Sequence, residues 1–341
     1  MKLFRFPGTV FALWIAAALL GSALPAAGSQ SDVDFFKGKV LTYIVATKPG
    51  GGYDTYARLI GKHLEKHLGV TVVIKNVPGA GHIIGANQLY AAKPDGLTIG
   101  TFNTGLIIAQ IVNQPGIKFD LRKFTYVGKA ASDARVIYVG AKAPHKNFQD
   151  ALKAKQLILG SSGVGASDYN EALMLGEAFG LPVKVITGYA GKEAELAILR
   201  GEIDGQVQSY SSIESYIKTG QGRVLLQIAD KKHPELANVP LASDIVPAKG
   251  KKLVDLIVAT SSSLQRLTVA PPGVPAGRLQ ALIAAYKATL SDPQLLAEAD
   301  KAQLPIEPLY GEEVGQLINH ALDQPADNLA LLKRIIKMEG M

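Results

Sequence analysis

Four glycine-rich turns contain the residues of this sequence whose types and spacing could bind a ligand. Each turn follows a predicted strand and opens a predicted helix. Glycine lets a ligand approach the backbone, and free N–H groups at a helix N-terminus, together with the helix dipole, favour an anion. A charge-assisted hydrogen bond contributes about 1.5–3 kcal/mol, so three or four could hold a carboxylate without an arginine. The turns are Pro49–Asp54, Asn103–Gly105, Ser161–Ser167 and Gly188–Gly191.

Each turn taken alone also fits an ordinary strand-to-helix connection, in which glycine serves only backbone geometry. Their joint occurrence in both halves of the chain is what favours a binding cleft. Asp204, which lies between Gly201 and Gly205, also has two interpretations. It fits a turn residue, and it fits a polar contact on the hinge side of a cleft.

Nucleotide-binding and nucleophile motifs fit the sequence less well. Residues 79–85 come close to a dinucleotide fingerprint, but the last spacing is one residue too long and Pro78 interrupts the entry. Residues 188–193 lack the spacing and the Ser/Thr of a P-loop, and residues 160–163 are one residue short of a nucleophile elbow. We therefore expect no catalytic residue and no cofactor.

Acid–base and metal chemistry have weak support. His63 and His67 have an i, i+4 spacing without the Glu of a zinc motif, so we interpret them as a solvated helix face and expect no metal. No paired carboxylates or triad accompany them. An enzyme on the same scaffold would have to draw its acid or base from three residues: Asp54, Asp204 and His82.

The elements that must position these turns alternate between strand and helix. Such alternation predicts parallel βαβ units with right-handed crossovers. Two stretches, 124–139 and 253–270, read as extended and could cross between two lobes around a cleft. The predicted strands cover residues 40–46, 70–77, 97–102, 156–161, 183–187, 203–209 and 224–228. The predicted helices cover residues 53–68, 82–92, 167–179, 191–200, 276–290 and a segment from 311 onward, the last two packing on the first lobe.

Length and composition restrict the class of protein. The chain has 341 residues, a formal charge of +7 and no cysteine, which excludes disulfides, iron–sulfur clusters and thiolate zinc sites. The length suggests two domains. Lysine clusters at 231–232 and 249–252 read as solvated loops, so we expect no nucleic-acid partner.

The first 28 residues have the order of a secretory signal peptide. Lys2 and Arg5 precede an apolar run over 10–20, and small residues follow up to Gly28. The apolar run is too short for a membrane span, which needs about 20 residues. We predict cleavage near Gly28 and a periplasmic protein; an uncleaved N-terminal anchor is the alternative.

Several blocks of sequence resemble one known family. Residues 48–58, Lys-Pro-Gly-Gly-Gly-Tyr-Asp-Thr-Tyr-Ala-Arg, are similar to the opening motif of the Bug family, the extracytoplasmic substrate-binding proteins of tripartite tricarboxylate transporters. Residues 76–81, 94–98, 160–167 and 201–205 resemble later blocks of that family in the same order. The resemblance covers essentially the whole chain after the predicted leader.

The resemblance implies an α/β fold of the type II periplasmic-binding-protein class, with two lobes joined by two hinge crossings around a ligand cleft. The implied layout is a signal peptide at 1–28, the first lobe at 29–130, the second lobe at 131–258, and a return to the first lobe at 259–341 with C-terminal helices. By position, the implied ligand-binding residues are Gly51, Gly52, Tyr53, Asp54, Asn103, Thr104, Ser161, Ser162, Gly163, Gly165, Ser167, Gly188, Tyr189, Asp204 and Gln208.

The implied function is a receptor, expected to be monomeric, that binds a small organic anion and delivers it to membrane permease subunits. Tyr53 stands where the family often has Thr, and Thr187–Lys192 replaces a commoner Val-Pro-Tyr-Lys-Gly pattern. His82 and the two residues after it replace the usual Gly-Asn-Ile. If Tyr53 and Tyr189 line the cleft, they favour an aromatic or longer acid. A periplasmic enzyme and a ligand-sensing subunit for a signalling receptor remain the alternatives.

Overall fold

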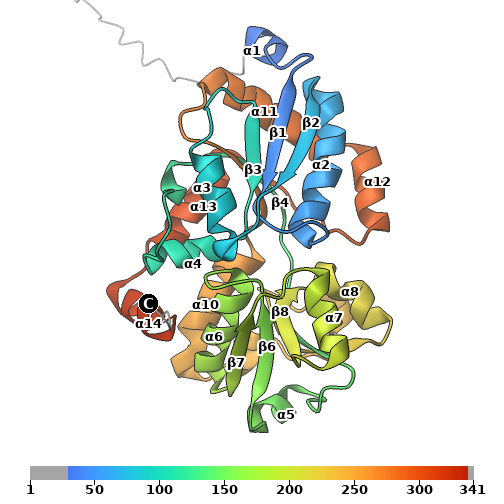
Figure 1. Ribbon diagram of the computed structural model, residues 1–341, viewed down its shortest axis with the longest axis vertical. Helices are drawn as coiled ribbons and strands as arrows, with labels where there is room; N and C mark the ends of the chain where they lie inside the picture. Colours follow the sequence, from blue (N-terminus) through green and yellow to red (C-terminus); the bar gives the residue numbers. More distant parts are fainter. Residues whose placement is uncertain (1–29, 337–341) are drawn as a thin grey trace, which may run out of the picture.

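A computed structural model describes residues 30–336 of the chain as two α/β lobes, one above the other in Figure 1. Each lobe is built around its own sheet, and the chain crosses between the lobes near the middle of the molecule. The predicted two-lobe α/β architecture is confirmed. The predicted signal peptide lies outside the described residues.

The first lobe contains a six-stranded mixed sheet. Strand β1 pairs in parallel with β2 and β3, as the βαβ pattern predicts, whereas β10 runs antiparallel to β3 and β4. The strand order is β11 (Leu309–Tyr310), β4 (Thr125–Ala131), β10 (Gln265–Ala270), β3 (Thr98–Thr101), β1 (Val40–Val45) and β2 (Thr71–Asn76). The helices of this lobe are α1 (Gln30–Asp34), α2 (Gly52–Leu68), α3 (Ile83–Tyr90), α4 (Gly105–Ile111), α11 (Ala276–Leu290), α12 (Pro293–Lys301) and α13 (Glu312–Leu322).

The second lobe contains a five-stranded sheet of the same kind. Strand β6 pairs in parallel with β7 and β8, and β5 runs antiparallel to β8 and β9. The strand order is β7 (Val183–Thr187), β6 (Leu157–Ser161), β8 (Gly205–Ser209), β5 (Arg135–Gly140) and β9 (Gly222–Ile228). The helices of this lobe are α5 (Phe148–Lys153), α6 (Ser167–Phe179), α7 (Lys192–Arg200), α8 (Tyr210–Lys218), α9 (Ala242–Ile245) and α10 (Lys251–Ile257).

Local sequence explains where helices α2 and α6 end. Helix α2 buries a stripe that includes Ala57, Ile60 and Leu64 at helical spacing. It ends at Gly69, which adopts φ 72° and donates its N–H to the Glu65 carbonyl; Gly180 ends α6 in the same way. A left-handed residue at this position favours glycine, so both ends could be predicted from the sequence.

The two crossings between the lobes lie side by side. The first runs from β4 to β5 and the second enters β10, and they are joined by bonds around Asp133: its N–H donates to the Ser262 carbonyl at 3.1 Å, and its carbonyl accepts from Ser262 Oγ at 2.8 Å and Gln265 Nε2 at 3.0 Å. The prediction that all of 253–270 is extended is wrong. Helix α10 and a π-helical turn over Val258–Ser262 occupy most of it, because the apolar residues of α10 pack on α6.

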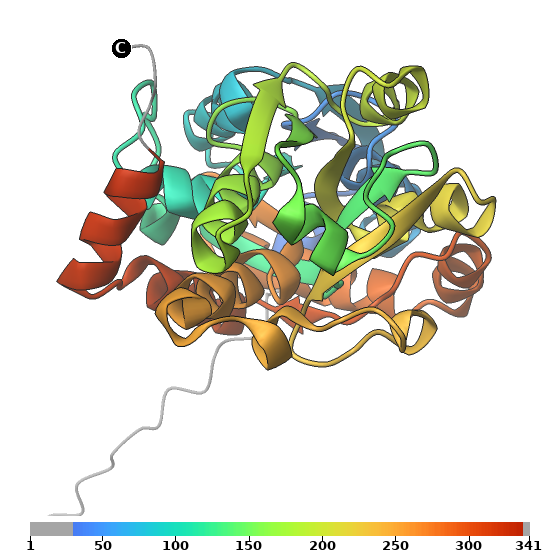
Figure 2. The ribbon, with the colours of Figure 1, turned by 90° about the horizontal axis from the view of Figure 1, so that it is seen from below.

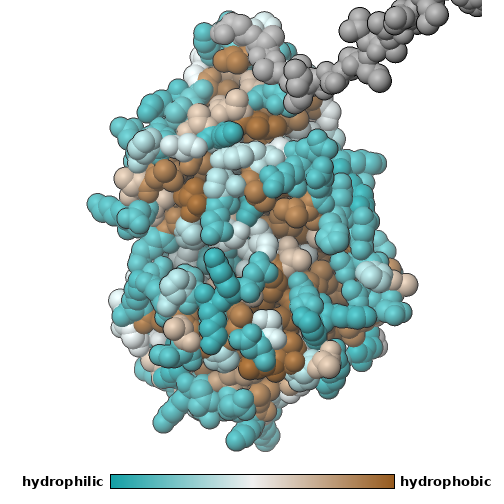
Figure 3. All heavy atoms as spheres, turned by 180° about the vertical axis from the view of Figure 1, so that it is seen from behind, coloured by the Kyte–Doolittle hydropathy of each residue, from teal (hydrophilic) through white to brown (hydrophobic). Residues whose placement is uncertain are grey.

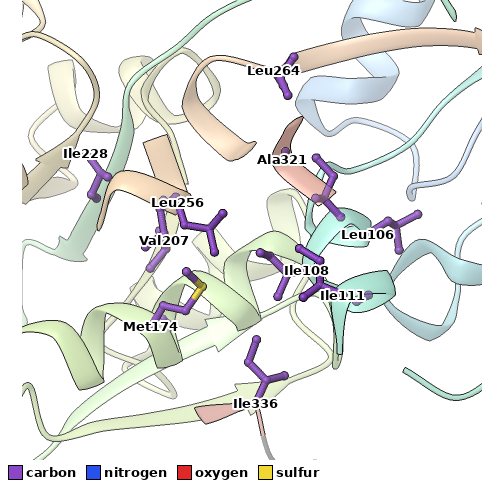
Figure 4. Close-up of a cluster of buried hydrophobic side chains, with 14 of the residues drawn as sticks. Leu106, Ile108, Ile111, Met174, Val207, Ile228, Leu256, Leu264, Ala321 and Ile336 are labelled. Carbon is purple, nitrogen blue, oxygen red and sulfur yellow. The ribbon is translucent and has the colours of Figure 1, made fainter. Parts of the chain in front are cut away.

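The largest apolar core is shared by the two lobes on one side of the molecule. Figure 4 shows Ile108 and Ile111 of α4 beside Met174 of α6, with Leu256 of α10 and Ala321 of α13 close by. The C-terminal part also departs from the prediction, since four helices lie between residues 276 and 336 instead of two. The last of them, α14 (Ala326–Ile335), packs against α6 of the second lobe rather than on the first and forms the red edge of Figure 2. The lobes are therefore fixed to each other along this side by apolar packing.

The surface of the molecule is mixed in character. The face turned away from the viewer of Figure 1 carries many hydrophilic side chains, with apolar residues visible between them (Figure 3). Within residues 30–336, no helix combines the length and the hydropathy needed to cross a bilayer.

Candidate functional site

A cavity of about 60 Å³ lies between the lobes, at the ends of the strands where the glycine-rich turns begin. Its walls come from both lobes, because the turns before α2 and α4 face those before α6 and α7. The first lobe contributes Thr47, Lys48, Gly51, Gly52, Tyr53, His82, Asn103 and Arg266. The second lobe contributes Ser162, Ser167, Asp168, Ala190, Gly191 and Gln208.

The structure brings some of the predicted binding residues together at this cavity and leaves others outside. Those that line it are Gly51, Gly52, Tyr53, Asn103, Ser162, Ser167 and Gln208. Those that do not are Asp54, Thr104, Ser161, Gly163, Gly165, Gly188, Tyr189 and Asp204. Of the three candidates for acid–base chemistry, His82 alone is a lining residue.

The polar side chains outside the cavity have other contacts. Asp54 Oδ2 accepts from the Gly50 N–H and from Arg58 Nε, both at 2.9 Å. Burial acts to raise the pKa of Asp54, but these bonds and one from Asn76 together hold it below its ordinary value. The Tyr189 hydroxyl donates to Glu202 at 3.2 Å, and Asp204 accepts from the Ile158 N–H at 2.8 Å. These groups stabilise the turns in which they lie.

Hydrogen bonds and an ion pair join the lobes around the cavity. On one side, Asn103 donates from Nδ2 to Ser167 Oγ at 2.8 Å and accepts from the Ser167 N–H at 3.0 Å. On the other side, Lys48 Nζ contacts the Glu193 carboxylate at 2.7 Å. Because both sides are bridged, a ligand larger than the cavity can enter only if the lobes move apart.

A buried ion pair lies beneath the second-lobe wall. Arg135 donates from Nε and Nη2 to Glu171 Oε2, at 2.9 and 2.7 Å, and the two side chains are only 5% and 2% exposed. Arg135 also donates to Ser209 Oγ at 2.9 Å and to Gln208 Oε1 at 3.3 Å. The pair thereby positions Gln208, which lines the cavity.

Asp168 organises the loop that supplies Ser162 to the cavity. Its carboxylate accepts from the Ser162 N–H at 2.8 Å, from Ser162 Oγ at 3.0 Å and from Gln206 Nε2 at 3.1 Å. Burial raises the pKa of Asp168 to about 6, even though the bonds from Ser162 act to lower it. The sequence pattern did not single out Asp168, since it lies inside a helix rather than in the turn.

The raised pKa of Asp168 predicts a pH-dependent contribution to stability. The folded protein holds the proton of the Asp168 carboxyl more tightly than the unfolded chain does, because the pKa of this group in the unfolded chain has its ordinary value of 3.8. Ionised Asp168 therefore destabilises the fold above pH 6, by on the order of 2–3 kcal/mol, and this cost disappears as the pH falls from 6 towards 4. Asp168→Asn cannot titrate, so the melting temperature of the wild type should rise relative to the variant between pH 7.5 and 4.5. A constant difference over that range would contradict the assignment.

His82 presents an acceptor to the cavity. Its Nδ1 lies 2.8 Å from the Ala46 carbonyl, which can only accept, so Nδ1 has the hydrogen and Nε2 is unprotonated. Burial lowers the pKa of His82, more than this hydrogen bond raises it. His82 is thus a neutral group, 3.5 Å from Ser162 Oγ through its Nε2.

Arg266, like Asp168, is a cavity residue that the sequence pattern does not reveal. It is 3% exposed, and its Cζ lies 4.7 Å from the ring centroid of Tyr53 and 4.9 Å from that of Tyr56. It belongs to β10, whose neighbours in the sheet are β3 and β4, so no local motif places it beside the Gly51–Tyr53 turn. The one available signal was a single charge within the otherwise uncharged segment 256–277, which was predicted to be extended in large part.

The two histidines of α2 differ in exposure, since only His67 reaches solvent. His63 is buried, and His67 Nε2 lies 2.9 Å from Asp292, which also contacts Lys66. The interpretation as a solvated helix face is therefore wrong for His63, which α12 covers. No group of three or more potential metal ligands occurs among residues 30–336.

Two α/β lobes that enclose a cavity at the ends of their strands have the architecture of the periplasmic binding proteins. The sequence profile of the tripartite tricarboxylate transporter family receptor matches residues 56–341, and the chain belongs to this family. The resemblance to the Bug family is thereby confirmed.

Individual relatives are distant in sequence. A UPF0065 protein of a Pseudomonas species is 27% identical over 224 residues, which span 64% of this chain and 66% of that relative. The solved structure of the periplasmic binding protein BugD has a TM-score of 0.75 at 21% identity, covering 88% of this chain and 98% of that one. The structure of MatC from Rhodopseudomonas palustris with bound malate has a TM-score of 0.70 at 20% identity, covering 88% and 99%.

Proposed function

We propose that the protein is a periplasmic receptor that binds a small carboxylate between its lobes and delivers it to a permease of the tripartite tricarboxylate type. The observation that carries this proposal is the cavity between the lobes, into which the N-terminal turns of α2, α6 and α7 all face. Free N–H groups and helix dipoles at such turns favour a negative charge. Family membership and the malate bound to MatC support the same class of ligand.

The apolar core shared by α4, α6 and α10 limits how the lobes can move. Parting them on that side would expose buried side chains such as Ile108 and Met174, at about 25 cal/mol per Å² of apolar surface. The opposite side is joined by the half-exposed pair Lys48–Glu193, and a pair of this kind contributes about 0–1 kcal/mol. We infer that the cavity opens on the Lys48 side.

The remaining parts of the proposal concern export, assembly and chemistry. The leader at 1–28 would direct the chain to the periplasm, and the receptor would act as a monomer that docks on the permease subunits. It would carry no cofactor and catalyse no reaction. Uptake measurements in a strain lacking the protein test transport directly: normal uptake with a lost transcriptional response would instead indicate the sensing alternative.

A screen for thermal stabilisation tests ligand class. Malate, succinate, adipate, benzoate, amino acids, phosphate and sulfate would each be added to the protein from residue 29 onward. Binding to the folded state alone stabilises it by about 2.7 kcal/mol at a hundredfold excess over Kd, so at least one carboxylate should raise the melting temperature measurably. A flat response to every carboxylate, or turnover of one of them, would overturn the proposal.

Tyr53 should affect affinity through the arginine it contacts. Its ring lies against the Arg266 guanidinium, and such a contact contributes about 0.5–2 kcal/mol. Tyr53→Thr, which restores the residue frequent in the family, should therefore weaken binding of the screened acid about 3- to 30-fold. Tyr53→Phe keeps the ring and is expected to bind within about twofold of the wild type by the same argument. Calorimetric titration of both variants distinguishes this role of the ring from a contact made by the Tyr53 hydroxyl. If the hydroxyl contacted the ligand, Tyr53→Phe would bind the acid as weakly as Tyr53→Thr.

A further inference from the structure

We propose that Arg266 forms a salt bridge with the carboxylate of the ligand. This salt bridge would be the main reason why the receptor prefers a negatively charged ligand to a neutral one. This inference rests on the proposed function, since it assigns a residue to the anion that the receptor would bind. It differs from the expectation drawn from the sequence, in which backbone N–H groups held the carboxylate without an arginine.

The guanidinium is buried without an acidic partner. Arg266 is 3% exposed, and no carboxylate of residues 30–336 lies within 4.0 Å of its nitrogen atoms. Its Nη2 donates to Ser212 Oγ at 3.2 Å, while Nε has no hydrogen-bond acceptor among the described atoms. A buried cation is costly unless an anion compensates it. A carboxylate in the cavity would supply that anion.

The other cations near the cavity already have partners. Lys48 is half-exposed and paired with Glu193, and Arg135 is paired with Glu171 beneath the wall. The charges of Asp133 and Arg266 also attract each other, but the Asp133 carboxylate accepts its hydrogen bonds from the hydroxyl and the N–H of Ser211 instead. Among the cations in and below the walls, Arg266 is thus the one available to a ligand.

The backbone at Arg266 is held in a costly conformation. Its φ is 58°, in the left-handed region that a long side chain rarely adopts. Strain of this kind persists where the surrounding structure imposes it, and it is concentrated at ligand sites. A glycine would adopt the same φ freely, so the strain is explained if the side chain is needed.

The position of Arg266 also connects the ligand to both lobes. The residue belongs to β10 of the first lobe, and its Nη2 reaches Ser212 of α8 in the second. Tyr53 and Tyr56 hold the guanidinium from the first-lobe side. An anion bound here contacts a group whose other partner lies across the cleft, so its binding favours the closed arrangement.

The test compares Arg266→Met and Arg266→Gly with a control arginine. Arg278→Met is the control, because Arg278 also lies over an aromatic ring, Phe35, and bonds to the Asp95 carbonyl, but does not line the cavity. Binding of malate, succinate, adipate and benzoate is measured by calorimetry, with malamide as the uncharged analogue of malate. The rise in melting temperature caused by formate is also recorded for each protein, because formate consists of little more than a carboxylate and probes the anion site alone.

We expect both Arg266 variants to lose at least 100-fold in affinity for the acid that binds, and to lose the preference for malate over malamide if malate is that acid. Arg278→Met should bind within threefold of the wild type. Both Arg266 variants should melt at or above the wild-type temperature, because an unpaired buried cation has been removed, and glycine also relieves the backbone strain at this position. Unfolding of both variants, or an acid affinity within threefold of the wild type, would overturn the assignment and leave the proposed function standing.

If no acid binds the wild type, the proposed function fails, and the formate measurement then decides on Arg266. Loss of the formate effect in both Arg266 variants still supports the anion site, whereas an unchanged formate effect in these variants overturns it.

Discussion

Replacing Glu171 with glutamine is expected to lower the free energy of unfolding by about 3–5 kcal/mol, because it leaves the Arg135 guanidinium buried without a counter-charge. Both side chains are almost completely buried, and Glu171 Oε2 accepts two hydrogen bonds from Arg135. Urea denaturation followed by circular dichroism measures the change.

A second ion pair on the same helix provides the control. Glu177 contacts Arg334 at 2.7 Å, but these two side chains are 43% and 61% exposed. An exposed pair contributes about 0–1 kcal/mol, so Glu177→Gln should change stability by no more than that. Equal losses from the two substitutions would contradict the argument from burial. The double variant Arg135→Met/Glu171→Leu should recover most of the stability but bind the ligand more weakly than the wild type, since Gln208 has lost its hydrogen bond from Arg135.

Replacing Gly52 with alanine is expected to weaken carboxylate binding by about 30- to 5,000-fold, the range for losing one partner of a buried charge pair. A Cβ at position 52 would lie 2.5 Å from Ser212 Oγ and 2.7 Å from Arg266 Nη2. The guanidinium can move aside, so we expect a small loss of stability. The displaced guanidinium can no longer contact the ligand in the same way, so the affinity falls.

The neighbouring glycine is a close control for this substitution. Gly51 also lines the cavity, but a Cβ there would meet only the Lys48 carbonyl oxygen, at 4.0 Å. Gly51→Ala should therefore bind within about threefold of the wild type, because an ordinary van der Waals contact displaces nothing. The comparison uses calorimetric titration with the best carboxylate of the screen and melting temperatures for both variants. Comparable losses of affinity in the two variants would show that bulk in the loop matters, rather than the position of Arg266.

Much of the fold could be predicted because its signals are local. Helix α6 begins and ends at the predicted residues, since a strand precedes its turn and a left-handed glycine follows it. The region of α10 was misread because the run from Leu253 to Ala259 is rich in β-formers, and only its packing on α6 shows that it is helical. The contact of α14 with the second lobe likewise depends on tertiary packing that the sequence pattern does not contain.

The candidate site could be predicted only in part, because some of its residues are placed by tertiary packing rather than by local sequence. The glycine-rich turns identify themselves, because their residues are adjacent in the sequence and their chemistry is local. The properties of Asp168 and Arg266 depend on tertiary structure. Burial raises the pKa of Asp168, which lies in helix α6. Arg266 is placed at the cavity by the pairing of β10 with β3 and β4. Tyr189 lies in a predicted turn, but its hydroxyl donates to Glu202 and its side chain lies outside the cavity wall. Spacing along the chain cannot predict such directions.

The central claim is that a carboxylate binds between the lobes with its charge on Arg266. A crystal structure of the protein with the best acid of the screen tests this claim most directly. We predict a carboxylate oxygen at about 2.7–2.9 Å from an Arg266 nitrogen, on the cavity side of Gly52 and facing Gln208. An acid bound outside the cleft, or one bound inside it with only uncharged atoms beside Arg266, would contradict the account.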